Sequence, residues 1–173
     1  DDVFTDKTML IIDTFLADII NRITSEAEEK GEQTAINELI QYSQYPTGHY
    51  SLITESISNL FIKLGNYSIE NQNFLEARDY FKSVIDYTPE KQEYVENRLE
   101  EISELLIESG DKFLQERDVE KAVHAYSRVF TVIPDYKPAQ TAIDKAFELE
   151  NKINKASDLA KSAQFLEMQK EYE

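Results

Sequence analysis

The sequence predicts an all-α fold built from antiparallel helix hairpins. Only 4 Gly and 4 Pro occur among 173 residues, so residues that interrupt helices are scarce. The apolar residues recur at intervals of three and four positions rather than in alternation, which is typical of amphipathic helices. A pattern of 17 residues is also written twice, at 73–89 and at 118–134, with Ala in the fifth place, an aromatic residue in the ninth and Pro in the last.

The repeated pattern describes a second helix together with the turn that precedes it. Asn73 and Asp118 open the two copies, and these residue types suit a tight turn because they tolerate left-handed backbone angles. Four further places match: a Gly that lets two helices approach, a small residue that does the same from the second helix, an aromatic residue that fills the remaining space, and a Pro that ends the helix. They are Gly65 and Gly110, Ala77 and Ala122, Phe81 and Tyr126, and Pro89 and Pro134.

These residues resemble the tetratricopeptide repeat, whose unit is a helix–turn–helix of about 34 residues. The resemblance implies an α-solenoid with about three hairpins and a long C-terminal helix, in a single array over residues 1–173. The units are expected at about 8–46, 49–89 and 90–134, and the last helix at about 137–172.

The first hairpin and the C-terminal helix match the pattern more loosely. Upstream, Ala35 and Leu39 stand in the places of the small and the aromatic residue, and Gly31 stands at the turn, but Ile23 replaces the Gly. At the C-terminus, Ala163 takes the Gly place and Tyr172 comes before an expected turn. The last helix is therefore expected either to cap the array or to begin a further unit.

The repeats are longer than the family's unit. Ala35 lies 42 residues before Ala77, and Ala77 lies 45 residues before Ala122. No linker rich in Gly, Pro or Ser absorbs the excess, so we expect it to lengthen the first helices, to roughly 49–71 and 90–116, each without a break.

The sequence contains no candidate catalytic, cofactor or metal site, and we expect neither enzymatic activity nor a cofactor. There is no Cys, and neither His49 nor His124 has a second His with which to share a metal. Carboxylates fall near one stripe of a single helix, where a solvated face is expected because metal ligands converge from several elements. They are Glu93, Glu96, Glu100, Glu104 and Glu108.

The net charge of the chain limits the kinds of partner that can be expected. With 18 basic and 34 acidic residues the net charge is −16, which repels phosphate backbones and argues against nucleic acid. The acidic surface either keeps the protein solvated or steers a basic partner. No apolar run approaches the length of a membrane span, so no membrane insertion is expected. Because neither an initiator Met nor a signal-like stretch opens the chain, we expect a piece of a longer protein.

The resemblance implies a groove lined by the first helices, which receives peptides or helices. One subclass of the family grips a C-terminal carboxylate through a groove Lys; Ile62 and Ile107 stand in that place here, so we expect no such binding. We expect instead an amphipathic or basic helix or peptide as the partner, or further repeats of the same chain. The groove has an apolar floor and an acidic edge, formed by Ile20, Ile62, Asn66, Ile69, Glu104, Ile107, Asp111 and Leu114.

Two functions remain open on the sequence. The first is a non-enzymatic scaffold that docks a partner protein. The second is a structural assembly or oligomerisation segment of a larger repeat protein, with a homo-oligomer as one form. The second is favoured by a small-residue seam in the last helix, which permits close packing against a neighbour. The seam comprises Ala142, Ala146, Leu149, Ile153, Ala156, Ala160 and Ala163.

Overall fold

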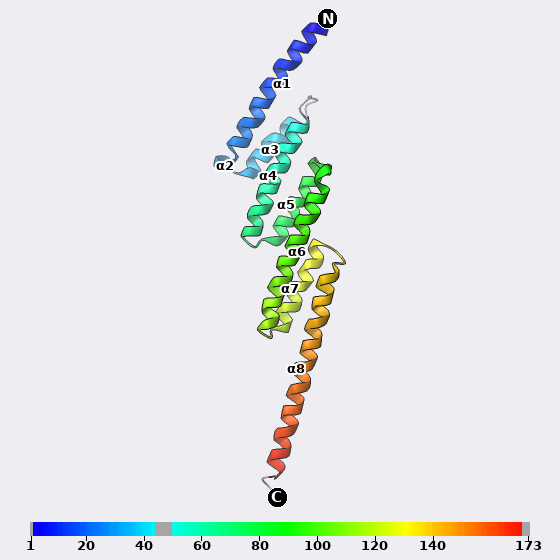
Figure 1. The fold of residues 1–173 in the computed structure, drawn as a ribbon. Helices are drawn as coiled ribbons and strands as arrows, with labels where there is room; N and C mark the ends of the chain where they lie inside the picture. The colour runs from blue at the N-terminus through cyan, green and yellow to red at the C-terminus, as the bar shows by residue number, and fades with distance from the viewer. Residues whose placement is uncertain (1, 44–49, 171–173) are drawn as a thin grey trace. The chain divides into compact units, whose positions relative to one another are not determined.

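The computed structural model describes residues 2–43 and 50–170, and every regular element in these two ranges is a helix (Figure 1). The all-α prediction is confirmed. In chain order the elements are α1 (Asp2–Ser25), α2 (Ala27–Lys30), α3 (Glu32–Ser43), α4 (Tyr50–Glu70), α5 (Phe74–Tyr87), the 3₁₀ helix η1 (Pro89–Lys91), α6 (Gln92–Gln115), α7 (Val119–Val132) and α8 (Lys137–Lys170).

The predicted long helices are present. α4 and α6 run without interruption over 21 and 24 residues, close to the expected 49–71 and 90–116. Pro89 opens η1 directly before α6, where its fixed φ and missing N–H cost nothing. The expected ends at Pro46 and Tyr172, and the connection that holds His49, lie outside the described residues.

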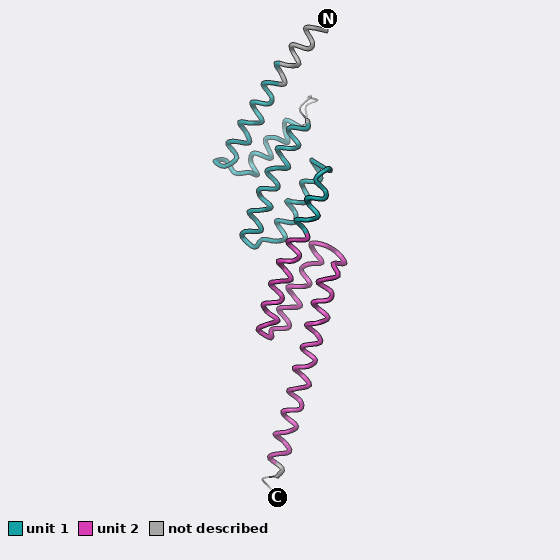
Figure 2. The backbone as a smooth tube through the Cα atoms, in the orientation of Figure 1, with its two compact units in different colours: residues 1–99 teal, residues 100–173 magenta. Residues whose placement is uncertain are grey.

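The chain divides into two compact units, Asp1–Leu99 and Glu100–Glu173, and the division falls within α6 (Figure 2). In the first unit α4 and α5 pack antiparallel. Near the turn, the Ser68 hydroxyl donates a hydrogen bond of 3.0 Å to Glu76 Oε2. At the opposite end of the pair, the Ser58 hydroxyl oxygen lies 2.7 Å from that of Thr88. The core between them is apolar and includes Ile53, Ile57, Phe81 and Val84, each 0% exposed.

Both matched glycines lie against the matched aromatic ring of the following helix. A Cβ on Gly65 would lie only 2.7 Å from Cζ of Phe81, and one on Gly110 would lie 2.6 Å from Cδ1 of Tyr126. Carbon atoms cannot approach so closely, so each glycine provides space for a ring. Ala77 and Ala122, one turn before the rings, are both 0% exposed, as expected for the second small residue.

The turns differ from the prediction by one position. The left-handed residues are Gln72 and Arg117, each with φ 62°, and not Asn73 and Asp118. Asn73 and Asp118 have φ near −90° and stand as the N-caps of α5 and α7. In each hairpin the left-handed residue follows the end of the first helix. The next residue then donates a backbone hydrogen bond to the last turn of that helix: Asn73 N donates to Ser68 O at 2.8 Å, and Asp118 N donates to Phe113 O at 2.9 Å.

The first hairpin contains a break that the pattern did not predict. α1 ends at Ser25 and α2 adds one short turn before Gly31, whose φ of +88° suits glycine. The Ser25 hydroxyl donates to Arg22 O at 2.9 Å, and such a local bond competes with the helical ladder. Ile23 and Leu39, at the places of the small and the aromatic residue, are both buried.

The second unit comprises the C-terminal part of α6, α7 and α8. Its core cluster is formed by Val119, Ala122, Tyr126, Ile143 and Ala146. α8 contributes to this core only through its first part, because Ala139, Ile143 and Ala146 are its buried residues.

Candidate functional site

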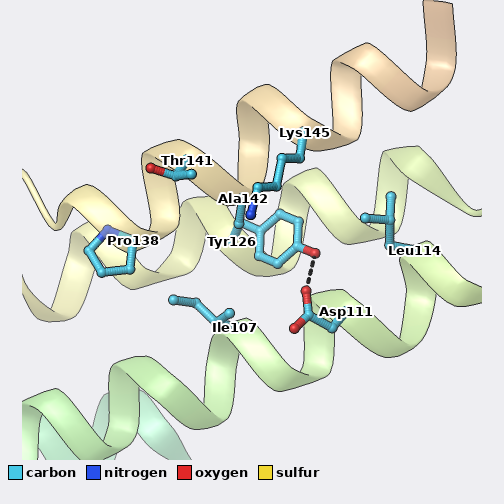
Figure 3. Close-up of a pocket in the computed structure, with 8 residues that line it drawn as sticks. All are labelled: Ile107, Asp111, Leu114, Tyr126, Pro138, Thr141, Ala142 and Lys145. Carbon is cyan, nitrogen blue, oxygen red and sulfur yellow. Dashed lines mark hydrogen bonds between the residues drawn. The ribbon is translucent and has the colours of Figure 1, made fainter. Parts of the chain in front are cut away.

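The candidate site is a pocket of about 300 Å³ in the second unit, lined by residues of α6 and α8 and by Tyr126 of α7 (Figure 3). From α6 it receives Ile107, Asp111 and Leu114, which are spaced by four and three positions and therefore share one face of the helix. All three were predicted as groove residues, and the structure brings them together.

The α6 side of the pocket is apolar with one carboxylate. Ile107 and Leu114 are half-buried and pack against the core cluster with one side. Asp111 is exposed, and its Oδ1 accepts a hydrogen bond of 2.7 Å from the Tyr126 hydroxyl (Figure 3). The bond fixes the carboxylate at the centre of the pocket wall.

Tyr126 contributes to this arrangement from α7. The residue is 0% exposed, and its hydroxyl donates a hydrogen bond to Asp111. Burial raises the pKa of the Tyr126 hydroxyl well above its usual value, and the hydrogen bond to Asp111 raises it further. The hydroxyl therefore stays protonated and donates at physiological pH.

α8 forms the opposite wall with residues that were not predicted to line the groove. They are Pro138, Thr141, Lys145 and Ala142, of which only Ala142 was named from the sequence, as part of the seam. Lys145 lines the pocket from α8 and adds a cation that the groove residues predicted from the sequence do not include (Figure 3). The sequence did carry a signal, since these residues also recur at helical spacing, but the sequence analysis assigned this helix a seam and no part of the groove.

In the first unit, the place that corresponds to this pocket is occupied by the side chain of Arg98. Ile62, Asn66 and Ile69 on α4 are half-buried. Asn66 Oδ1 accepts a hydrogen bond of 2.8 Å from Arg98 Nη2, and the Arg98 guanidinium lies 5.2 Å from the centre of the Phe81 ring. Such a cation–π contact and hydrogen bond hold the arginine over the ring.

The two remaining predicted groove residues have different surroundings. Ile20 is only 1% exposed, so it belongs to the core of the first unit and offers no surface to a partner; the counting from the loosely matched first hairpin placed it wrongly. Glu104 is exposed. Burial raises the pKa of Tyr136, and the negative charges of Glu104 and Glu100 raise it further.

The described residues contain no group of three or more His, Cys, Asp or Glu that could hold a metal ion. His124 is exposed on α7. Among the helices of residues 2–43 and 50–170, none combines the length and apolar character needed to cross a membrane. Comparison with protein-family models found no match, and comparisons with curated proteins and with solved structures also found none.

Proposed function

We propose that the chain is a tetratricopeptide-like α-solenoid segment that acts as a non-enzymatic scaffold and docks a partner helix or peptide. The local geometry supports the repeat. Gln72 and Arg117, 45 residues apart, have the same left-handed φ, and the backbone hydrogen bonds around the two turns match one for one. Both units also place an aromatic ring against a glycine.

The observation that carries the proposal is the pocket between α6 and α8. Three groove residues expected from the sequence line it, with an apolar floor half-open to solvent. Leaving such apolar surface in water costs about 25 cal/mol per Å², which a docked apolar side chain would recover. A helix in a groove presents apolar anchors at this spacing.

The charges favour a partner helix with basic flanks. Asp111 stands in the pocket wall and Glu104 lies one turn before Ile107 on α6, both exposed. The chain as a whole carries −16, which accelerates the approach of a cationic partner at low salt. Lys145 opposes this preference locally, and therefore provides a test of it.

The test uses two synthetic amphipathic helical peptides that share one apolar face but carry either Lys or Glu flanks. Fluorescence anisotropy should show tighter binding of the Lys-flanked peptide, with an affinity that falls as salt rises. Ile107→Ala should weaken it by roughly tenfold, as expected for the loss of an apolar contact. Lys145→Ala should strengthen it.

The matched control is Phe147→Ala, which removes a large apolar side chain from α8, 47% exposed and outside the pocket. It should leave the affinity unchanged. Circular dichroism of each variant separates lost binding from lost folding. Equal affinity for both peptides, or equal effects of Ile107→Ala and Phe147→Ala, would exclude this pocket as the docking site.

The second function, an assembly segment, is favoured by a different observation. The C-terminal part of α8 exposes large apolar side chains, among them Leu159 and Leu166. This surface is distinct from the pocket.

A further inference from the structure

The two units place matching polar residues beside the aromatic ring, but only the first unit supplies an arginine to them. Asn66 and Asp111 stand 45 residues apart, each directly after the glycine that faces the ring. Asn66 is half-buried, and its Oδ1 accepts a hydrogen bond of 2.8 Å from Arg98 Nη2. Asp111 is exposed, and the residue 45 positions after Arg98 is Ile143, which has no side-chain donor. The second unit therefore has the acceptor without the arginine.

Asp111 keeps the capacity to accept from a second donor. The Tyr126 hydroxyl uses Oδ1, at 2.7 Å, and an ionised carboxylate has two oxygens with about four acceptor sites. The negative charge of Asp111 also adds a Coulombic attraction that the neutral amide of Asn66 does not offer to Arg98. A guanidinium thus finds at Asp111 the kind of acceptor that Arg98 finds at Asn66, with a charge added.

The apolar walls of the pocket suit the stem of an arginine. Ile107 and Leu114 precede and follow Asp111 on the same face of α6, and both are half-buried (Figure 3). Arginine buries its methylene stem along such apolar surface while its charged end remains at a polar group. The ring of Tyr126 is 0% exposed, so the carboxylate, and not the ring face, is the contact for the guanidinium. A volume of about 300 Å³ suits a single long side chain rather than a whole helix.

We propose that the pocket binds an arginine side chain of the docked partner, with the guanidinium at Asp111 and the stem against Ile107 and Leu114. This assignment rests on the docking function proposed above and names the residue that anchors the partner. Lysine is the weaker occupant, because its ammonium is more strongly hydrated and lacks the planar fork that matches a carboxylate. Lys145 also lines the pocket and repels either cation, so its charge limits the affinity.

Nuclear magnetic resonance of the intact chain tests the pocket without a helical partner. The probes are N-acetyl-arginine methylamide, its lysine analogue, and its citrulline analogue, which keeps the shape of arginine without the charge. The arginine probe should shift the amide signals of Ile107, Asp111 and Leu114 saturably, with a dissociation constant in the millimolar range, and it should bind more tightly than either analogue. Equal binding of the arginine and citrulline probes, or the absence of saturable shifts at these residues, would overturn the assignment.

Substitutions in the pocket identify the group that holds the probe. Asp111→Asn introduces the residue of the first unit and keeps an acceptor for the Tyr126 hydroxyl. It should weaken the arginine probe by roughly three- to fivefold, as expected for the loss of an ion pair at an exposed carboxylate. Lys145→Met keeps the stem, removes the repelling charge and should strengthen binding. The matched control is Glu108→Gln, which removes one negative charge from an exposed residue of α6 outside the pocket and should leave the affinity nearly unchanged.

Equal weakening by Asp111→Asn and Glu108→Gln would show that the net charge of the chain attracts the probe, and this result would also overturn the assignment. Circular dichroism of each variant checks folding. Arginine binding and helix docking can fail separately. If the arginine probe binds as stated but neither amphipathic peptide binds, the pocket assignment holds and the docking function is wrong. If the Lys-flanked peptide binds but the arginine probe does not, docking holds and the assignment is wrong.

Discussion

Replacing Gly110 by Ala is the most direct test of the packing in the second unit. The glycine faces the ring of Tyr126, and an added Cβ would lie 2.6 Å from Cδ1 and 2.9 Å from Cζ of that ring. The ring cannot easily withdraw, because it is 0% exposed and its hydroxyl is bonded to Asp111. One helix must therefore move away from the other.

Two opposing contributions set the magnitude. Alanine stabilises a helix interior by roughly 0.5–1 kcal/mol relative to glycine. Overpacking of a rigid core costs roughly 1–3 kcal/mol, and the blocked ring places this site in the upper part of that range. We therefore expect Gly110→Ala to lower the free energy of unfolding by about 1–2 kcal/mol, although alanine is the better helix former.

Urea denaturation followed by circular dichroism measures this free energy. A second variant, Tyr126→Leu, removes the ring, and Gly110→Ala made in that background should cost less than in the native chain. The double-mutant cycle isolates the contact between the two residues. If Gly110→Ala is neutral or stabilising in the native chain, the glycine is not required for ring packing, and the explanation of the matched Gly–aromatic pairs fails.

Two further predictions concern polar groups. The pKa of Tyr126 is raised in the folded state, so above pH 10 the unfolded chain loses a proton that the folded chain keeps. The stability of the fold should therefore decrease above pH 10, and it should decrease less steeply in Tyr126→Phe. Thermal melts across pH 8–11 would measure both effects. Asp118 Oδ1 accepts from Lys121 N at 3.1 Å, whereas Asn73 makes no side-chain capping bond, so Asp118→Ala should lower the melting temperature and Asn73→Ala should leave it nearly unchanged.

Most of the helices could be predicted from the sequence because their residues have strong local conformational preferences. Pro89 has a fixed φ, and the unbroken apolar period of α6 leaves no position at which to end a helix before Gln115. The left-handed residues Gln72 and Arg117 were missed, because neither residue type favours that region and the turn is imposed by the helices on both sides.

The site was predicted only in part, for reasons of tertiary contact. Ile107, Asp111 and Leu114 could be placed on one face from their spacing alone. Lys145 could not be paired with them, since no local rule says which face of α8 turns toward α6. Ile20 was misplaced because its hairpin lacks the glycine that fixes the register of the others, and α1 breaks at Ser25.

The hydroxyl of Tyr126, which Phe81 lacks, distinguishes the pocket of the second unit from the corresponding place in the first unit. Tyr126 has a hydroxyl that donates a hydrogen bond to Asp111, and both residues line an open pocket. Phe81 has none, and Asn66 instead accepts from Arg98, which covers the ring. Forty-five residues after Arg98 stands Ile143, a core residue, so the second unit has no arginine at the position from which Arg98 covers the Phe81 ring. The same backbone geometry therefore yields a closed place in the first unit and an open one in the second, and partner docking is proposed for the second.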